Sequence, residues 1–179
     1  TKLQQIDSTA RAYTYIACSA SGKYVAACCN TNYLMFSADY GVTWFPKLSA
    51  SLNMFGVAFS ASGKYCLVTV IGSQMRLSSD YGQTFATVGP SAGWRFCGMN
   101  ATGQIMYAAA ETDAVVYRSL DYGATWNTVP GLSASTWRAV GVSATGQYVL
   151  LAANGSSAIV SRDYGTTWTT IGSSQWRDA

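Results

Sequence analysis

Three tryptophan–arginine pairs are the side chains of this chain best suited to hold a ligand. They are Trp94–Arg95, Trp137–Arg138 and Trp176–Arg177. An indole ring can stack on the face of a sugar ring, and a guanidinium group can hydrogen-bond hydroxyl or carboxylate oxygens. Two interpretations stay open: the pairs form a repeated ligand-binding site, or the indoles are wedges between packed sheets with the arginines capping backbone carbonyls.

The acidic residues give little support for acid–base catalysis. Glu111 is the only glutamate, and Asp113 follows it two positions later. On an extended segment two such side chains lie about 7 Å apart, which overlaps the spacing of about 6.5–9.5 Å in inverting glycosidases. The segment is nevertheless expected to be a turn open to water, so we predict two solvated turn residues and no catalytic pair.

Histidine is absent from the 179 residues, which removes the commonest general base and metal ligand. The five cysteines are an odd number, contain no Cys-x-x-Cys motif and lie in apolar segments, so we expect buried free thiols. They are Cys18, Cys28, Cys29, Cys66 and Cys97. We predict no metal site and no cofactor, and we expect that the chain is not an enzyme.

Charged residues make up only 11% of the chain, against about 25% in a typical domain. The net charge of +3 is dispersed without a basic run, so nucleic acid is not an expected partner. No apolar run approaches the roughly 18 residues that span a bilayer, so membrane insertion is not expected. A polar but weakly charged surface suits an extracellular, cell-surface or virion protein, with a cytoplasmic location left open.

An octet with the pattern Ser-x-Asp-x-Gly-x-Thr-Trp occurs four times, with phenylalanine as its last residue in the second copy. Its aspartates are Asp39, Asp80, Asp121 and Asp163. Successive aspartates are 41, 41 and 42 positions apart. A second marker with a central Ala-Ser-Gly or Ala-Thr-Gly keeps the same period, at Gly22, Gly63, Gly103 and Gly146. Two independent patterns with one period predict a repeat protein.

Each repeat is expected to contain four short antiparallel strands. The first two flank the Ala-Ser-Gly or Ala-Thr-Gly turn, and the last two flank the octet, as the glycine and Asp-x-Gly punctuation predicts. In the fourth repeat the strands are expected at about 138–143, 147–152, 158–161 and 167–171. The second strands, at 24–29, 65–70 and 148–153, are nearly continuously apolar. A strand that is apolar on both faces is covered on both faces, which is typical of stacked propeller blades. The predicted fold class is therefore all-β.

The octet resembles the Asp-box, or BNR repeat, of sialidases, sortilin-type receptors and lectin-like propellers. That resemblance implies a β-propeller of four-stranded blades, with each box as a structural turn. Its aspartate would accept backbone hydrogen bonds, its glycine would take positive φ, and its aromatic ring would be buried between blades. The box positions are Ser37, Asp39, Gly41, Trp44, Ser78, Asp80, Gly82, Phe85, Ser119, Asp121, Gly123, Trp126, Ser161, Asp163, Gly165 and Trp168.

Sialidase activity does not follow from the resemblance, because a sialidase needs an arginine cluster, a Tyr–Glu pair and an acidic proton donor. We expect instead a non-catalytic recognition or adhesion module, with glycan binding at a cell or virion surface as the sharpest version. A structural or assembly protein that binds other proteins through blade faces is the first alternative. A propeller fragment of a sialidase-like glycoside hydrolase is the second. The box tyrosines form a second candidate surface, Tyr40, Tyr81, Tyr122 and Tyr164.

One propeller domain is expected over residues 1–179, with repeats at about 7–48, 49–89, 90–131 and 132–173. Residues 1–6 resemble the end of a blade, and 174–179 resemble the start of another. Three arrangements stay open: a closed four-bladed ring, part of a larger propeller, or a ring completed by a second chain in a homo-oligomer.

Overall fold

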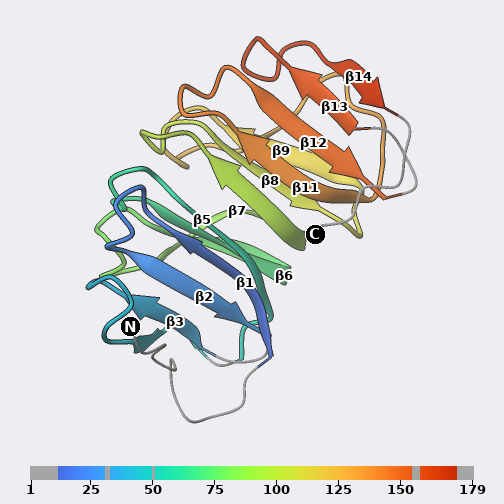
Figure 1. Cartoon of the computed structure of the whole chain (residues 1–179). Helices are drawn as coiled ribbons and strands as arrows, with labels where there is room; N and C mark the ends of the chain where they lie inside the picture. The colour runs from blue at the N-terminus through green and yellow to red at the C-terminus, as the bar shows by residue number, and fades with distance from the viewer. Residues whose placement is uncertain (1–11, 31–32, 50, 155–157, 173–179) are drawn as a thin grey trace.

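The computed structural model describes residues 12–30, 33–49, 51–154 and 158–172. Strands in three antiparallel sheets make up its regular structure, in the orders β1-β2-β3-β4, β10-β9-β8-β7-β6-β5 and β11-β12-β13-β14 (Figure 1). The strands are β1 (Tyr13–Cys18), β2 (Val25–Cys29), β3 (Leu34–Ser37), β4 (Phe45–Lys47), β5 (Met54–Phe59), β6 (Cys66–Ser78), β7 (Ala86–Met99), β8 (Met106–Ala110), β9 (Val115–Ser119), β10 (Asn127–Thr128), β11 (Trp137–Val142), β12 (Val149–Ala153), β13 (Ala158–Ser161) and β14 (Thr169–Gly172). Within these residues no helix is long and apolar enough to cross a membrane.

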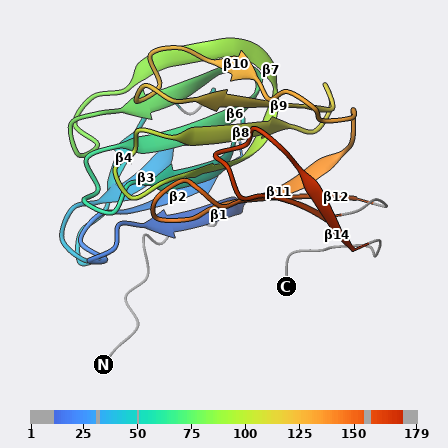
Figure 2. The same cartoon turned by 90° about the horizontal axis from the view of Figure 1, so that it is seen from above.

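The strands group into four similar units. Unit 1 is β1–β4 and unit 4 is β11–β14, each a four-stranded sheet. Unit 2 comprises β5, β6 and residues 86–92 of β7, and unit 3 comprises residues 93–99 of β7 with β8, β9 and β10. Units 2 and 3 share one sheet because β7 runs from unit 2 into unit 3, and Ile71 of β6 pairs with Gly93 across the junction (Figure 2).

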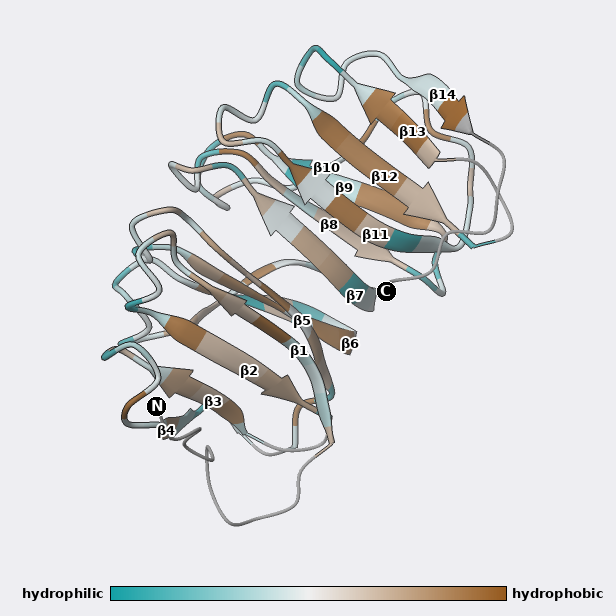
Figure 3. Cartoon of the chain, viewed as in Figure 1, coloured by the Kyte–Doolittle hydropathy of each residue, from teal (hydrophilic) through white to brown (hydrophobic). Residues whose placement is uncertain are grey.

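Apolar side chains fill the three spaces between successive units. Phe36 and Val68 belong to the cluster between units 1 and 2. Trp94 lies between units 2 and 3, and Trp137 and Leu151 lie between units 3 and 4. Figure 3 shows the apolar colouring along β2 and β12. The strand β2 and residues 66–70 of β6 are buried along nearly their whole length, as the sequence predicted, and so is β8.

The four octets form four turns of the same geometry. In the first, the Ser37 hydroxyl donates to Asp39 at 2.8 Å and accepts the Gly41 N–H at 2.9 Å, while Asp39 accepts the Thr43 N–H at 2.8 Å. Gly41 has a φ of 80°, and so do Gly82, Gly123 and Gly165 within a few degrees. The preceding tyrosines also have positive φ, near 60°, which the sequence did not indicate.

The expectation of five buried cysteines is wrong at one position. Cys28, Cys29, Cys66 and Cys97 are buried free thiols, whereas Cys18 is exposed because it lies on β1, the edge strand of the first sheet. Burial raises the pKa of the Cys97 thiol to about 12.

The sheets do not close into a ring within the described residues. Units 1 and 4 lie at the two ends of the stack (Figures 1 and 2). Ile16 on unit 1 is 61% exposed, and Leu150 on unit 4 is 43% exposed. The closed four-bladed ring, one of the three expected arrangements, is therefore not formed. The matching chain ends at 1–6 and 174–179 lie outside the described residues.

Candidate functional site

The two described tryptophan–arginine pairs are split between core and surface. Trp94 is fully buried, donates from Nε1 to the Pro90 carbonyl at 3.0 Å and meets Tyr117 edge-on. It cannot stack on a ligand, so that expectation is corrected in favour of the wedge interpretation. Trp137 is 4% exposed and is also wedged between units. The third pair, Trp176–Arg177, lies outside the described residues.

Both arginines of these pairs reach the same carboxylate. Glu111 forms ion pairs with Arg95 of its own unit and with Arg138 of the next unit, and its side chain is only 12% exposed. Arg95 also lies over the ring of Phe55 in unit 2, at 4.8 Å from the centroid. The expectation that Glu111 is a solvated turn residue is therefore wrong, because two guanidinium groups from adjacent strands enclose it. The arginines were also expected to cap carbonyls in the wedge interpretation, and they bind this side chain instead.

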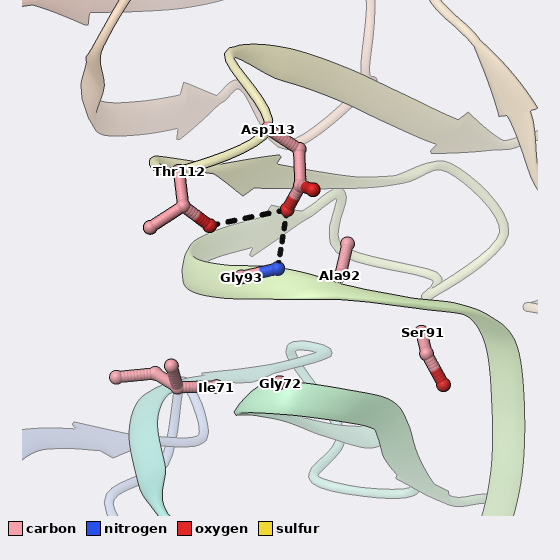
Figure 4. A pocket seen from close by; sticks show the side chains of 7 residues that line it. All are labelled: Ile71, Gly72, Ser91, Ala92, Gly93, Thr112 and Asp113. Atoms are coloured by element: carbon pink, nitrogen blue, oxygen red, sulfur yellow. Dashed lines mark hydrogen bonds between the residues drawn. The ribbon is translucent and has the colours of Figure 1, made fainter.

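The second acid of the turn has a different neighbour. Asp113 is exposed, as predicted, and accepts the Gly93 N–H at 2.5 Å and the Thr112 hydroxyl at 3.2 Å (Figure 4). This carboxylate borders a pocket of about 320 Å³ at the junction of units 2 and 3, beside Ile71 and Gly72. With Glu111 bound to two arginines and Asp113 bound to backbone, neither acid is arranged as one of a free catalytic pair.

A second pocket, of about 280 Å³, lies on unit 4 beside the segment that leads into β11. Its lining residues are Gly131, Leu132, Ser133, Ala134, Ser135, Trp137, Ile159, Trp168 and Thr170. Apolar and hydroxyl side chains line it, and none of these residues carries a charge. We refer to it as the indole pocket, because two tryptophans border it.

Both indole nitrogens of the indole pocket are buried donors without an acceptor. The indoles equivalent to Trp168 in two other octets have acceptors: Trp44 donates to the Gly41 carbonyl at 2.9 Å and Trp126 to the Gly123 carbonyl at 3.1 Å. In unit 4 the matching carbonyl, that of Gly165, accepts a guanidinium N–H of Arg118 at 2.9 Å. An indole N–H can only donate, and an unsatisfied buried donor costs about 1–3 kcal/mol.

The sequence pattern indicates Trp137 as a ligand candidate and Trp168 as a structural residue. Trp137 was singled out with Arg138, whereas Trp168 was read as a box residue. One signal was present in the spacing. Trp137 follows Trp126 by 11 positions, whereas Trp94 follows Phe85 by nine, and the longer connection contains Gly131 to Ser135, which line the pocket.

The box tyrosines lie together at one edge of the units. Each of their backbone N–H groups donates to a residue of the glycine turn in its own unit, as Tyr81 does to Lys64 at 3.1 Å. Tyr40 is 66% exposed, and Tyr81, Tyr122 and Tyr164 are between 41% and 46% exposed. They form an exposed row, and neither of the two pockets described above is lined by them.

Four-stranded antiparallel units that pack face to face define the class of β-propeller proteins. Solved structures similar to the chain agree with this fold. A GH74 enzyme from Niastella koreensis is 26% identical with a TM-score of 0.66, over 87% of this chain and 24% of that one. YCF48 from Cyanidioschyzon merolae is 14% identical with a TM-score of 0.69, over 97% and 60%.

A further similar structure is an auxiliary nutrient binding protein from Bacteroides thetaiotaomicron, 9% identical with a TM-score of 0.70 over 93% and 43% of the two chains. YCF48 has also been solved with a bound D1 peptide. No family model and no curated protein matches the sequence. The chain spans between about a quarter and 82% of these structures, and their resemblance shows a propeller fold and not a particular activity.

Proposed function

We propose that the chain is a non-catalytic recognition module of Asp-box blades, and that it binds a neutral carbohydrate in the indole pocket. The single observation that carries this proposal is the pair of unpartnered N–H donors of Trp137 and Trp168 in one pocket. Both nitrogens are buried in the unliganded structure, so the pocket wall would have to move slightly for a sugar oxygen to reach them. The apolar surface and hydroxyl groups of the pocket match the C–H faces and hydroxyl groups of a sugar.

The size and charge of the pocket support a small uncharged ligand. Its volume of about 280 Å³ lies at the lower end of the range of small-molecule pockets, about 300–1,000 Å³. Since no charged residue lines it, a sialic acid or a phosphate would find no counter-charge there. The proposal therefore concerns a neutral sugar residue, and the low charge of the chain supports a location at a cell or virion surface.

Enzymatic activity is not part of the proposal. The glycosidases among the similar structures are about four times longer than the matched chain, judged from the 24% coverage. Among the described acids, the four octet aspartates accept hydrogen bonds within their turns, and Glu111 and Asp113 are bound as described above. A fragment of a longer hydrolase stays an alternative in which other residues supply catalysis.

The test compares two substitutions of the same type. Trp168→Phe removes the N–H but keeps an aromatic ring, and Phe85 already stands at this position of unit 2. Trp126→Phe is the control, because its N–H donates to Gly123. On a glycan array followed by calorimetry, wild type binds a neutral glycan, and Trp168→Phe binds it about 5–150-fold more weakly, the equivalent of 1–3 kcal/mol.

Indole N–H resonances provide a second readout. The chain has six tryptophans, and those of Trp137 and Trp168 are expected to shift when the glycan is added. Equal affinities of the two variants would exclude the indole pocket as the site. If no glycan binds and peptides shift the same two resonances, the ligand is a protein carbonyl group, and the assembly alternative replaces carbohydrate binding.

A further inference from the structure

Successive units interlock through glycines that accept side chains from the preceding unit. In the glycine turns, a Cβ at Gly63 or Gly103 would clash with the ring of Tyr24 or Tyr65, and one at Gly146 would lie 2.6 Å from Ile105. Tyr24 and Tyr65 also pack against the box tyrosines of the next unit, with centroids 5.3 Å apart. The first turn differs: a Cβ at Gly22 would meet none of the residues that the structure describes within 4 Å.

The box glycines repeat this relation. A Cβ at Gly82 would clash with Phe36, one at Gly123 with Leu77 and one at Gly165 with Tyr107, all from the preceding unit. The first box glycine has no such neighbour, because a Cβ at Gly41 would meet only Trp44 of its own unit, at 3.6 Å. Within the described residues, Gly22 and Gly41 of unit 1 are therefore two sockets that no side chain from another unit fills.

A backbone ladder connects the glycine turns in the same direction. The Ala20 N–H donates to the Ala61 carbonyl at 3.0 Å, Ala61 to Ala101 at 2.9 Å, and Ala101 to Ala144 at 2.9 Å. Within the described residues the ladder ends with the Ala144 N–H as a donor on unit 4 and the Ala20 carbonyl as an acceptor on unit 1. The two ends are complementary.

Unit 4 presents the side chains that would fill the sockets. Tyr148 stands at the position of Tyr24 and Tyr65 in the repeat, and it is 51% exposed. Leu150 stands at the position of a residue that is fully buried in each of the other units, and it is 43% exposed. Those equivalents are Ala26, Leu67 and Tyr107.

The receiving face has a matching exposed side chain. Ile16 on unit 1 is 61% exposed, whereas its equivalents Val57 and Cys97 are 1% and 9% exposed and Val140 is half-buried. Exposed apolar side chains whose equivalents are buried or half-buried between neighbouring units mark an interaction surface. The same features indicate that this surface binds another unit of the same kind. The exposed side chains of unit 4 match the glycine sockets of unit 1, and the Ala144 N–H matches the Ala20 carbonyl.

We infer that unit 4 of one chain docks on unit 1 of a second copy, head to tail, and that the second joint closes a two-chain ring. Such a heterologous joint closes only if the rotation between units permits it.

Light scattering on the purified chain tests this inference. Wild type is expected at twice the chain mass of 19.1 kDa. Leu150→Lys is expected to raise the dimer dissociation constant by about tenfold or more per joint. Leu120→Lys is the matched control, since Leu120 is 46% exposed in an octet turn and its equivalents do not enter a joint; this variant should remain dimeric.

Mixing two variants separates a head-to-tail joint from a symmetric one. Ile16→Lys damages the receiving face and Leu150→Lys the docking face, so a one-to-one mixture contains one intact joint and should re-form a dimer that neither variant forms alone. A symmetric interface would show no such rescue and would overturn the inference. A monomeric wild type would also overturn it and would leave further units of a longer polypeptide as the occupant. If Leu150→Lys does not fold, the dimer–monomer comparison of Ile16→Lys with wild type decides.

Discussion

Glu111→Gln tests whether one carboxylate holds units 3 and 4 together. The change keeps the shape of the side chain and removes its charge, which leaves the guanidinium groups of Arg95 and Arg138 near each other without a counter-ion. Breaking a fully buried ion pair costs about 3–5 kcal/mol. The arginine side chains are 31% and 39% exposed, so water compensates part of the loss, and we expect about 2 kcal/mol.

Urea unfolding with linear extrapolation measures the effect. A loss of about 2 kcal/mol corresponds to a melting temperature lower by about 4–8 °C for a domain of this size. Because the penalty includes repulsion between like charges, it should shrink in high salt. Arg138→Gln should cost less than Glu111→Gln, since Arg95 still pairs with the carboxylate. The double variant should cost less than the sum of the single ones. A Glu111→Gln protein as stable as wild type would refute the reasoning.

Three further predictions concern the turns and the thiols. Gly63→Ala should destabilise more than Gly22→Ala, by about 1–3 kcal/mol from overpacking, because both glycines have positive φ but only Gly63 faces the ring of Tyr24; chemical denaturation of the pair measures the difference. Acid should unfold the octet turns: hydrogen bonds from the threonines lower the pKa of Asp39, Asp121 and Asp163 below the usual 3.8. Each therefore contributes stability that is complete above the unfolded pKa and lost as pH falls below about 3.8 toward the folded value, which circular dichroism against pH can follow. A thiol reagent should modify Cys18 in the native protein and the four buried cysteines only after unfolding.

Each of these predictions has a contradicting result. Equal losses of stability for the two glycine variants would mean that the ring of Tyr24 moves aside without strain. Stability that is constant down to the lowest pH would mean that the aspartates have the same pKa in the unfolded chain. Rapid modification of more than one thiol in the native protein would show that the units separate readily.

The period of the octets predicted the strands well because turn chemistry is local. The octet supplies its own hydrogen bonds, from Ser37 and Asp39 to the backbone of the same turn, so eight residues determine the hairpin. The third strand of unit 4 was predicted at 158–161 and is observed there. The first and second strands begin or end within two residues of the predicted bounds.

The candidate site could be predicted only in part, because its chemistry depends on which units are neighbours. Glu111 was read as solvated since its turn is polar, and only the packing of β7 and β11 brings two arginines to it. The unpartnered N–H of Trp168 depends on Arg118 of unit 3, which occupies the carbonyl that the indole would otherwise use. Likewise, the apolar pattern of β12 predicts burial on both faces, and Leu150 is exposed because no unit follows it within the described residues.

The fusion of units 2 and 3 into one sheet has a consequence for cooperativity. A stack of repeats behaves as a row of nearest-neighbour couplings, and its weakest coupling opens first. Here the central coupling includes the continuous strand β7 and the main-chain pair Ile71–Gly93 in addition to apolar contact, whereas the outer two joints depend on side chains and single turn hydrogen bonds. Amide protons of β6, β7 and β8 should therefore exchange last, and the end units should unfold around a persistent six-stranded centre.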